Sequence, residues 1–79
     1  MKKALFNPGQ LYKVKKSFVS GTSSFLDREI LTFESDAYSP YDSSFAYEFR
    51  AKNGDTKTWW LPEDEAADSW TRLFEIVSP

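Results

Sequence analysis

The sequence contains no histidine and no cysteine among its 79 residues. Imidazole is the most frequent general base in enzymes and the thiolate is a common nucleophile, so both of these catalytic routes are absent from the chain. The remaining candidates are carboxylates such as Asp27 and Glu29, and solvated surface acids of this kind are common in proteins without catalytic activity. We therefore predict that the protein is not an enzyme and has no catalytic residue.

Motifs for metals and cofactors are also lacking. The hydroxyl-rich stretch Ser20-Gly21-Thr22-Ser23-Ser24 has neither the glycine spacing nor the lysine of a phosphate-binding loop. No run of alternating acids around a glycine provides a calcium loop. We expect no cofactor and no metal.

Long hydrophobic runs are missing as well. No segment approaches the length of a membrane span, and the apolar residues Ala4, Leu5 and Phe6 are too few for the core of a secretion signal. The absence of cysteine permits a reducing compartment. These features predict a cytoplasmic protein.

Aromatic residues, by contrast, make up 18% of the sequence, and the formal net charge is only −2. A chain of this length has apolar area for one core, so we expect a single domain over residues 1–79 with a core over about residues 8–77. Charge is unevenly spread, because residues 1–19 hold five lysines and no acid, whereas residues 63–68 hold four acids.

Alternation of apolar and polar residues predicts three strands. They lie over residues 10–19, 29–35 and 44–51, and the last of these alternates most regularly. Asn7-Pro8-Gly9 is typical of a turn before the first strand, and residues 20–24 are expected to form a flexible loop. A further loop is expected over residues 38–42, where Pro40 opposes regular strand pairing.

A fourth strand is predicted after the pair Asn53-Gly54, which favours a two-residue hairpin turn. This turn would place Tyr47 opposite Trp60 and would direct Trp60 into the core. Trp59 would then lie on the outer face.

From Pro62 onward the apolar residues recur at spacings of three and four, which favours an amphipathic helix carrying Trp70, Leu73 and Phe74 as a lid over the sheet. Residues 74–77 alternatively form a short closing strand, and the pattern leaves both open. The predicted fold is a β-rich α+β domain with four, possibly five, antiparallel strands. We expect a strongly bent, SH3-like sheet or partial barrel with a C-terminal helix.

Several short motifs resemble a family of short, uncharacterised bacterial domains. They are Pro8-Gly9-x-x-Tyr12-x-Val14, Phe18 before a loop, Glu29-x-Leu31-x-Phe33 and Tyr38-x-Pro40-Tyr41-Asp42, which together span roughly residues 8–62. The family usually has glycine where this chain has Arg28. Because it has no assigned activity, the resemblance implies a fold only. A looser similarity to small SH3-like barrels, carried by residues 29–33 and the pair Trp59-Trp60, implies a bent sheet.

A binding role is the remaining hypothesis. Tyr38, Tyr41 and Asp42 lie in a predicted loop, and Trp59 is predicted to face outward. Exposed tyrosine and tryptophan side chains offer large contact areas and concentrate binding energy in protein interfaces. We predict a small bacterial or phage protein that docks on another protein through these four residues. The alternative interpretation is that Tyr38 and Tyr41 plug one end of the sheet.

Single-stranded nucleic acid is an alternative partner. Lys13 and Lys15 are predicted on the wet face of the first strand, and Arg50 is predicted directly opposite Lys57 with Trp59 on the same face. Bases stack on aromatic side chains beside such cationic surfaces. The acidic net charge argues against this alternative. The oligomeric state is left open.

Overall fold

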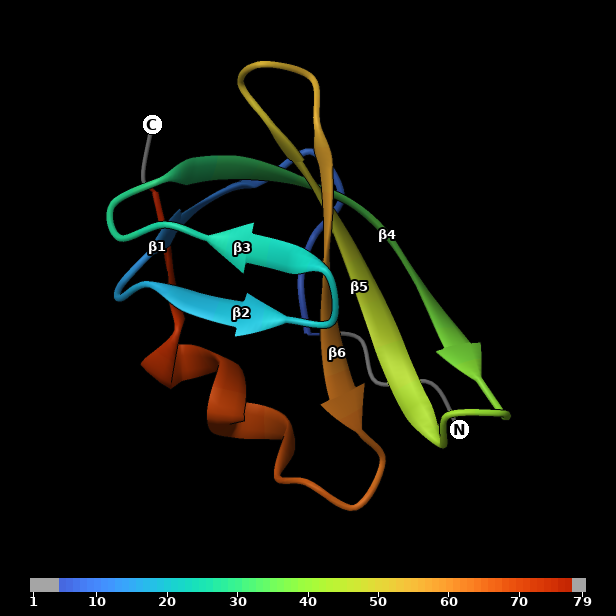
Figure 1. Cartoon of the computed structure of the whole chain (residues 1–79). Coiled ribbons are helices and arrows are strands. Elements are labelled where there is room, and N and C mark those ends of the chain that lie inside the picture. The colour runs from blue at the N-terminus through green and yellow to red at the C-terminus, as the bar shows by residue number, and fades with distance from the viewer. Residues whose placement is uncertain (1–4, 78–79) are drawn as a thin grey trace.

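Figure 1 shows the computed structural model of the chain, in which residues 5–77 are described. The elements, in chain order, are β1 (Leu11–Val14), β2 (Phe18–Ser20), β3 (Ser23–Phe25), β4 (Ile30–Ser39), β5 (Ser44–Ala51), β6 (Thr56–Pro62), η1 (Ala67–Arg72) and β7 (Phe74–Ile76). The element η1 is a 3-10 helix, and residues 5–77 contain no α-helix. The fold is therefore all-β, and the prediction of an α+β domain is wrong. Lys2 and Lys3, part of the basic start of the sequence, lie outside the described residues.

Five of the strands form one antiparallel sheet in the order β6-β5-β4-β1-β7. The other two strands, β2 and β3, form a separate antiparallel hairpin. The large sheet ends at β6 on one side and β7 on the other, and no strand pairing between them closes it within residues 5–77. The predicted SH3-like sheet or partial barrel is thus replaced by an open sheet with a hairpin laid across it.

The predicted alternation is confirmed in the centre of the sheet. Tyr12 and Val14 of β1 are buried, and so are the rows of alternate side chains that β4 and β5 turn to the same face. In a strand, successive side chains point to opposite faces, so apolar residues at every second position produce one buried face. The predicted strand over residues 44–51 matches β5 residue for residue.

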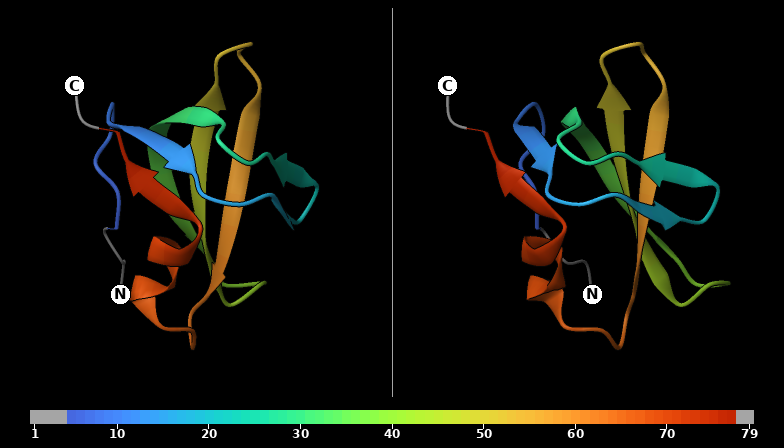
Figure 2. Two further views of the ribbon diagram at one scale, coloured as in Figure 1. Left: turned by 90° about the vertical axis from the view of Figure 1, so that its left-hand side faces the viewer. Right: turned by 60° about the vertical axis from the view of Figure 1, so that its left-hand side comes forward.

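The segment over residues 10–25 differs from the prediction. The expected single strand is divided into β1 and β2. The expected flexible loop supplies Ser23 and Ser24 of β3 and the tight turn that joins β3 to β2. Gly21, with φ of +58°, provides the left-handed backbone of this turn. Figure 2 shows that the β2–β3 hairpin crosses β6 at a steep angle.

The hairpin also covers the outer edge of β6. The N–H of Thr58 donates to Ser23 Oγ at 3.1 Å, and the N–H of Trp60 donates to Ser20 Oγ at 2.8 Å. An uncovered edge strand is a template for pairing with other chains, and serine hydroxyls satisfy its donors without adding another strand. Ser20 and Ser23 therefore have a structural role at this edge.

The β5–β6 hairpin has a three-residue loop instead of the predicted two-residue loop. The N–H of Gly54 donates to the carbonyl of Ala51 at 3.0 Å, and the N–H of Ala51 donates to the carbonyl of Asp55 at 2.8 Å. Gly54 alone takes positive φ, at +92°, whereas Asn53 does not. This is a type I turn followed by a left-handed glycine, which shifts the pairing by one residue relative to a two-residue loop.

As a consequence, Tyr47 lies opposite Trp59, and Trp60 lies opposite Ala46. Trp59 is buried with 5% of its surface exposed, and Trp60 is 36% exposed. The predicted register, which placed Trp60 in the core and Trp59 outside, is therefore wrong. A shift of one residue in a strand exchanges the two faces.

The predicted C-terminal helix is also wrong. The N–H of Glu65 donates to the carbonyl of Pro62 in a turn, and the following Ala66 is extended and provides no side-chain cap for a helix. Residues 74–76 pair with β1 as a closing strand, so they are unavailable for a helix. The lid residues nevertheless reach their expected place, because Trp70 and Leu73 pack against the core from η1 and its C-cap, and Phe74 is buried in β7.

The centre of the core is Phe6, which precedes the first strand and lies outside the predicted core range. Its exposed fraction is 5%, and its ring centroid lies between 5.0 and 6.0 Å from those of seven other aromatic rings. These rings belong to Tyr12, Phe33, Tyr47, Phe49, Trp59, Trp70 and Phe74. Most of the contacts are edge-to-face, the geometry that the quadrupoles of aromatic rings favour. Phe6 thus fills the space between the sheet and the C-terminal segment.

Candidate binding surface

Of the four residues predicted to bind a partner, three are exposed and one is buried. Tyr38 is 43% exposed and Tyr41 is fully exposed, and Asp42 is also on the surface. Trp59 is buried in the core, so its predicted place in a binding surface is wrong. Its neighbour Trp60 is the tryptophan that reaches the surface. Tyr38 lies on the inner face of the sheet with Phe45 and Leu61, whereas Trp60 lies on the outer face opposite Ala46. We call Tyr41, Asp42 and Trp60 the tyrosine–tryptophan surface, because Asp42 and Trp60 line one hollow and Tyr41 adjoins Asp42 in the chain.

The connection between β4 and β5 is shorter than predicted. Strand β4 continues to Ser39, which pairs with Ser44, so Tyr38 lies in a strand and its ring packs 5.1 Å from that of Phe45. Ser43, with φ of +48°, completes the tight reversal. The plug interpretation therefore applies in part to Tyr38, which covers Phe45, and not to Tyr41, which is fully exposed.

Asp42 is held by the serines around it. Ser39 Oγ donates to Asp42 Oδ2 at 2.8 Å, and Ser44 Oγ donates to the main-chain carbonyl of Asp42 at 3.0 Å. Short polar side chains commonly order turns by bonds of this type. The carboxylate of Asp42 has the capacity for further hydrogen bonds, because it accepts about four in total.

The end of β6 is tied to the same loop. The phenol of Tyr38 donates to Glu63 Oε2 at 2.5 Å, and the N–H of Glu63 donates to the carbonyl of Ser43 at 2.9 Å. The bond to the Glu63 carboxylate raises the pKa of Tyr38, because the neutral phenol is the donor in this bond. Two loops that are distant in sequence are thereby joined into one surface.

A hollow of about 410 Å³ lies beside Trp60 and is lined by Gly21, Asp42, Ser44 and Trp60. Gly21 comes from the β2–β3 turn, Asp42 and Ser44 from the β4–β5 connection, and Trp60 from β6. The indole lies close to Gly21, since a Cβ atom there would stand 3.1 Å from Trp60 Nε1. Glycine thus allows the indole to lie against the turn and form one wall of the hollow.

The chain around this hollow is acidic. Residues 36–49 and 58–71 contain no lysine or arginine. The acids on the two joined loops are Asp42, Glu63, Asp64 and Glu65, and all of them are exposed. These two stretches of the chain therefore carry a negative formal charge.

The residues of the nucleic-acid alternative do not form one surface. Arg50 pairs across the hairpin with Thr56 rather than with Lys57, so the predicted opposition of two cations is wrong. Arg50 lies 2.9 Å from a carboxylate oxygen of Glu34. Trp59, the predicted stacking platform, is buried and offers no face to a base.

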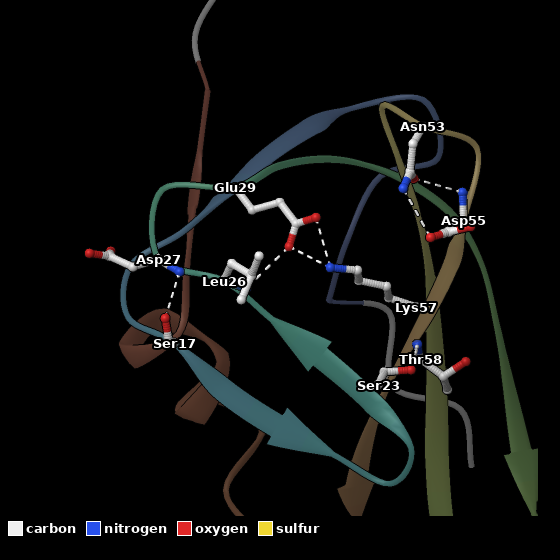
Figure 3. Close-up of polar contacts among 9 residues, drawn as sticks. All are labelled: Ser17, Ser23, Leu26, Asp27, Glu29, Asn53, Asp55, Lys57 and Thr58. Atoms are coloured by element: carbon white, nitrogen blue, oxygen red, sulfur yellow. Dashed lines mark hydrogen bonds and ion pairs between the residues drawn. The ribbon is translucent and has the colours of Figure 1, made fainter.

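The lysines of that alternative have partners as well. Lys57 Nζ lies 2.7 Å from both carboxylate oxygens of Glu29 (Figure 3). Lys13 lies 3.5 Å from the Glu75 carboxylate, and Lys15 Nζ donates to the carbonyl of Thr71 at 2.9 Å. The Glu29 and Glu75 carboxylates offset the charges of Lys57 and Lys13, whereas the carbonyl of Thr71 leaves the charge of Lys15 in place.

Within residues 5–77, no helix has both the length and the apolar character needed to cross a lipid bilayer. The same part of the chain brings together no group of three or more acidic side chains in an arrangement that would hold a metal ion.

The fold and this surface define a small all-β domain with an exposed aromatic and acidic end. No protein-family model matches the chain, and no curated protein matches it significantly. Among solved structures, the chain is similar to an integron cassette protein from the mobile metagenome of Vibrio cholerae, with 25% sequence identity and a TM-score of 0.73. The match covers 92% of this chain and 87% of that chain, so the two share the fold over nearly their whole length.

Proposed function

We propose that this protein is a non-catalytic binding module that docks on another protein through the tyrosine–tryptophan surface. The observation that carries the proposal is the exposure of aromatic side chains on the β4–β5 connection and on β6, with Tyr41 fully exposed and Trp60 36% exposed beside a hollow. Large aromatic side chains on a surface lose apolar hydration when a partner covers them, and they dominate many protein interfaces.

The rigidity of the surface supports the same proposal. Asp42 is held by Ser39 and Ser44, and the bond from Tyr38 to Glu63 joins the two loops. A surface that is ordered before binding loses less conformational entropy when a partner docks. The turn that carries Tyr41 and Asp42 is thus ordered before a partner docks.

We also propose a bacterial or phage origin and a cytoplasmic location. The similarity to an integron cassette protein of a bacterium supports the origin. The absence of cysteine is consistent with a reducing compartment.

The test is affinity capture from a bacterial lysate with immobilised wild-type protein and two variants, Tyr41→Ser and Trp60→Ser. We expect both variants to lose a partner that the wild type retains, at unchanged melting temperature for Tyr41→Ser. The matched control is Leu26→Ser, since Leu26 is a 57% exposed apolar residue outside the tyrosine–tryptophan surface. Equal capture by all four proteins would refute the proposed surface.

A further inference from the structure

We propose that the hollow beside Trp60 receives an arginine side chain from a basic segment of the partner protein. This inference rests on the proposed function and names the chemical class of the partner. The site consists of the Trp60 indole as a stacking wall and the Asp42 carboxylate as an acceptor, with Gly21 and Ser44 completing the hollow.

The two principal walls match the two chemical properties of a guanidinium group. Its planar cation stacks on the face of an indole, and its donors form bonds with a carboxylate, often two at once. Trp60 is on the outer face of the edge strand β6, and Asp42 lines the same hollow from the β4–β5 connection. A lysine offers the charge without the planar fork, so arginine fits this pair of walls better.

The charge around the hollow selects the same class of ligand. Glu63, Asp64 and Glu65 follow β6 directly, and the N–H of Glu63 is bonded to Ser43 of the Asp42 loop. Residues 36–49 and 58–71, which include Asp42 and these three acids, contain no lysine or arginine. This excess of negative formal charge attracts a cationic segment and repels the phosphates of a nucleic acid.

The glycine at position 21 adds a steric argument. A Cβ atom at Gly21 would stand 3.1 Å from Trp60 Nε1 and 3.2 Å from Trp60 Cδ1, so a larger residue would displace the indole. The β2–β3 turn thus holds the pyrrole edge of Trp60 and leaves the rest of the ring at the surface, where 36% of the residue is exposed. The indole is positioned before any ligand arrives.

The probe is a tetra-arginine peptide, titrated into isotopically labelled full-length protein and followed by nuclear magnetic resonance. We expect saturable shifts of the Trp60 indole N–H and of the Asp42 amide, with binding that weakens as salt rises. Tetra-lysine should bind at least about threefold more weakly than tetra-arginine, because the ammonium group of lysine has no planar face to stack on the indole. A tetra-glutamate peptide and a single-stranded oligonucleotide should produce no shift at Trp60, and a shift with either would overturn the proposal.

Variants separate this site from general attraction between opposite charges. Asp42→Asn and Trp60→Leu should each weaken tetra-arginine binding about threefold or more, whereas Trp60→Phe keeps a stacking face and should weaken it less. The matched control is Glu75→Gln, which removes an acid of the opposite edge strand and should leave the affinity unchanged. The proposal fails if Glu75→Gln weakens binding as much as Asp42→Asn, or if no saturable shift occurs.

Failure of this inference can be told apart from failure of the proposed function. A captured partner that is lost with Trp60→Ser but retained at equal affinity by Asp42→Asn, at low and high salt, would leave the docking surface in place and refute its basic ligand. A partner retained by both variants would refute the surface itself. Dimerisation of the free protein that Trp60→Leu abolishes would identify a second copy of the chain as the occupant and would also overturn the inference.

Discussion

Tyr47 lies directly opposite Trp59 in the β5–β6 hairpin, with ring centroids 5.6 Å apart, and both side chains are buried. Because neighbouring residues of a strand point to opposite faces, this pair obliges Trp60 to lie on the outer face. The surface tryptophan of the proposed binding site is therefore a consequence of the hairpin register. The register in turn depends on the loop at Gly54.

Replacing Gly54 tests this dependence. Gly54 has φ of +92°, and a Cβ atom at this position would contact nothing within 4 Å, so any cost of substitution comes from the backbone. Gly54→Val should reduce the free energy of unfolding by about 1 to 3 kcal/mol, measured by urea denaturation. Gly54→Asn should cost less, because asparagine tolerates left-handed backbone. Equal stability of the wild type and the valine variant would contradict this account of the loop.

Phe6 should be among the residues that stability depends on most. Phe6→Ala removes a ring that contacts aromatic side chains of the sheet and of the C-terminal segment, and we expect a loss of about 3 to 5 kcal/mol. Val19→Ala, at a position that is 70% exposed, should change stability by less than about 0.5 kcal/mol. If thermal melts of the two variants coincide, Phe6 is not central to the core.

The Glu29–Lys57 ion pair is the best shielded of the ion pairs described here, with 19% and 15% of the two side chains exposed. Glu29 also accepts a bond from the N–H of Leu26 at 3.1 Å. Glu29→Gln should reduce stability by about 1 to 3 kcal/mol, since it leaves a partly buried ammonium without its counter-charge.

The Lys13–Glu75 pair provides the comparison, because it is longer and more exposed. Glu75→Gln should cost less than about 1 kcal/mol. A double-mutant cycle with Lys57→Met should give a coupling energy for Glu29 and Lys57 well above that for Glu75 and Lys13. Similar coupling energies for the two pairs would show that burial contributes nothing to the Glu29–Lys57 pair.

The buried phenol of Tyr47 predicts a loss of stability at alkaline pH. Burial, with a smaller contribution from the nearby Asp36 carboxylate, raises the pKa of Tyr47 to about 12. The phenol of the unfolded chain ionises near pH 10, at about the usual tyrosine value. Between these values only the unfolded state loses the proton, so the stabilisation is complete below about pH 10 and is lost progressively toward pH 12.

Tyr47→Phe should therefore make the fall of the urea midpoint shallower over this range of pH. The control is Phe45→Leu, which disturbs the neighbouring part of the core without removing a titrating group, and it should keep the wild-type slope. An unchanged slope in Tyr47→Phe would show that another group causes the alkaline loss.

Much of the sheet follows from local patterning. The alternation over residues 44–51 predicts β5 with its bounds, and the parity of Tyr12, Val14, Leu31 and Phe33 predicts which side chains are buried. Asn53-Gly54 predicts the place of the hairpin turn. The exposure of Tyr38, Tyr41 and Asp42 was likewise predictable from the sequence, because a short segment with Pro40 interrupts two runs of apolar residues.

Long-range contacts decided the rest. A loop of two or three residues is compatible with the same Asn-Gly pair, and the choice between them exchanged Trp59 and Trp60 between core and surface. An apolar spacing of three and four residues describes a helix, yet residues 74–76 pair with β1, from which about 60 positions separate them along the chain. Phe6 is a single aromatic before a turn, and no local pattern connects it with Trp70. Pairing and packing of distant segments gain more free energy than local propensity does, and only the folded chain brings those segments together.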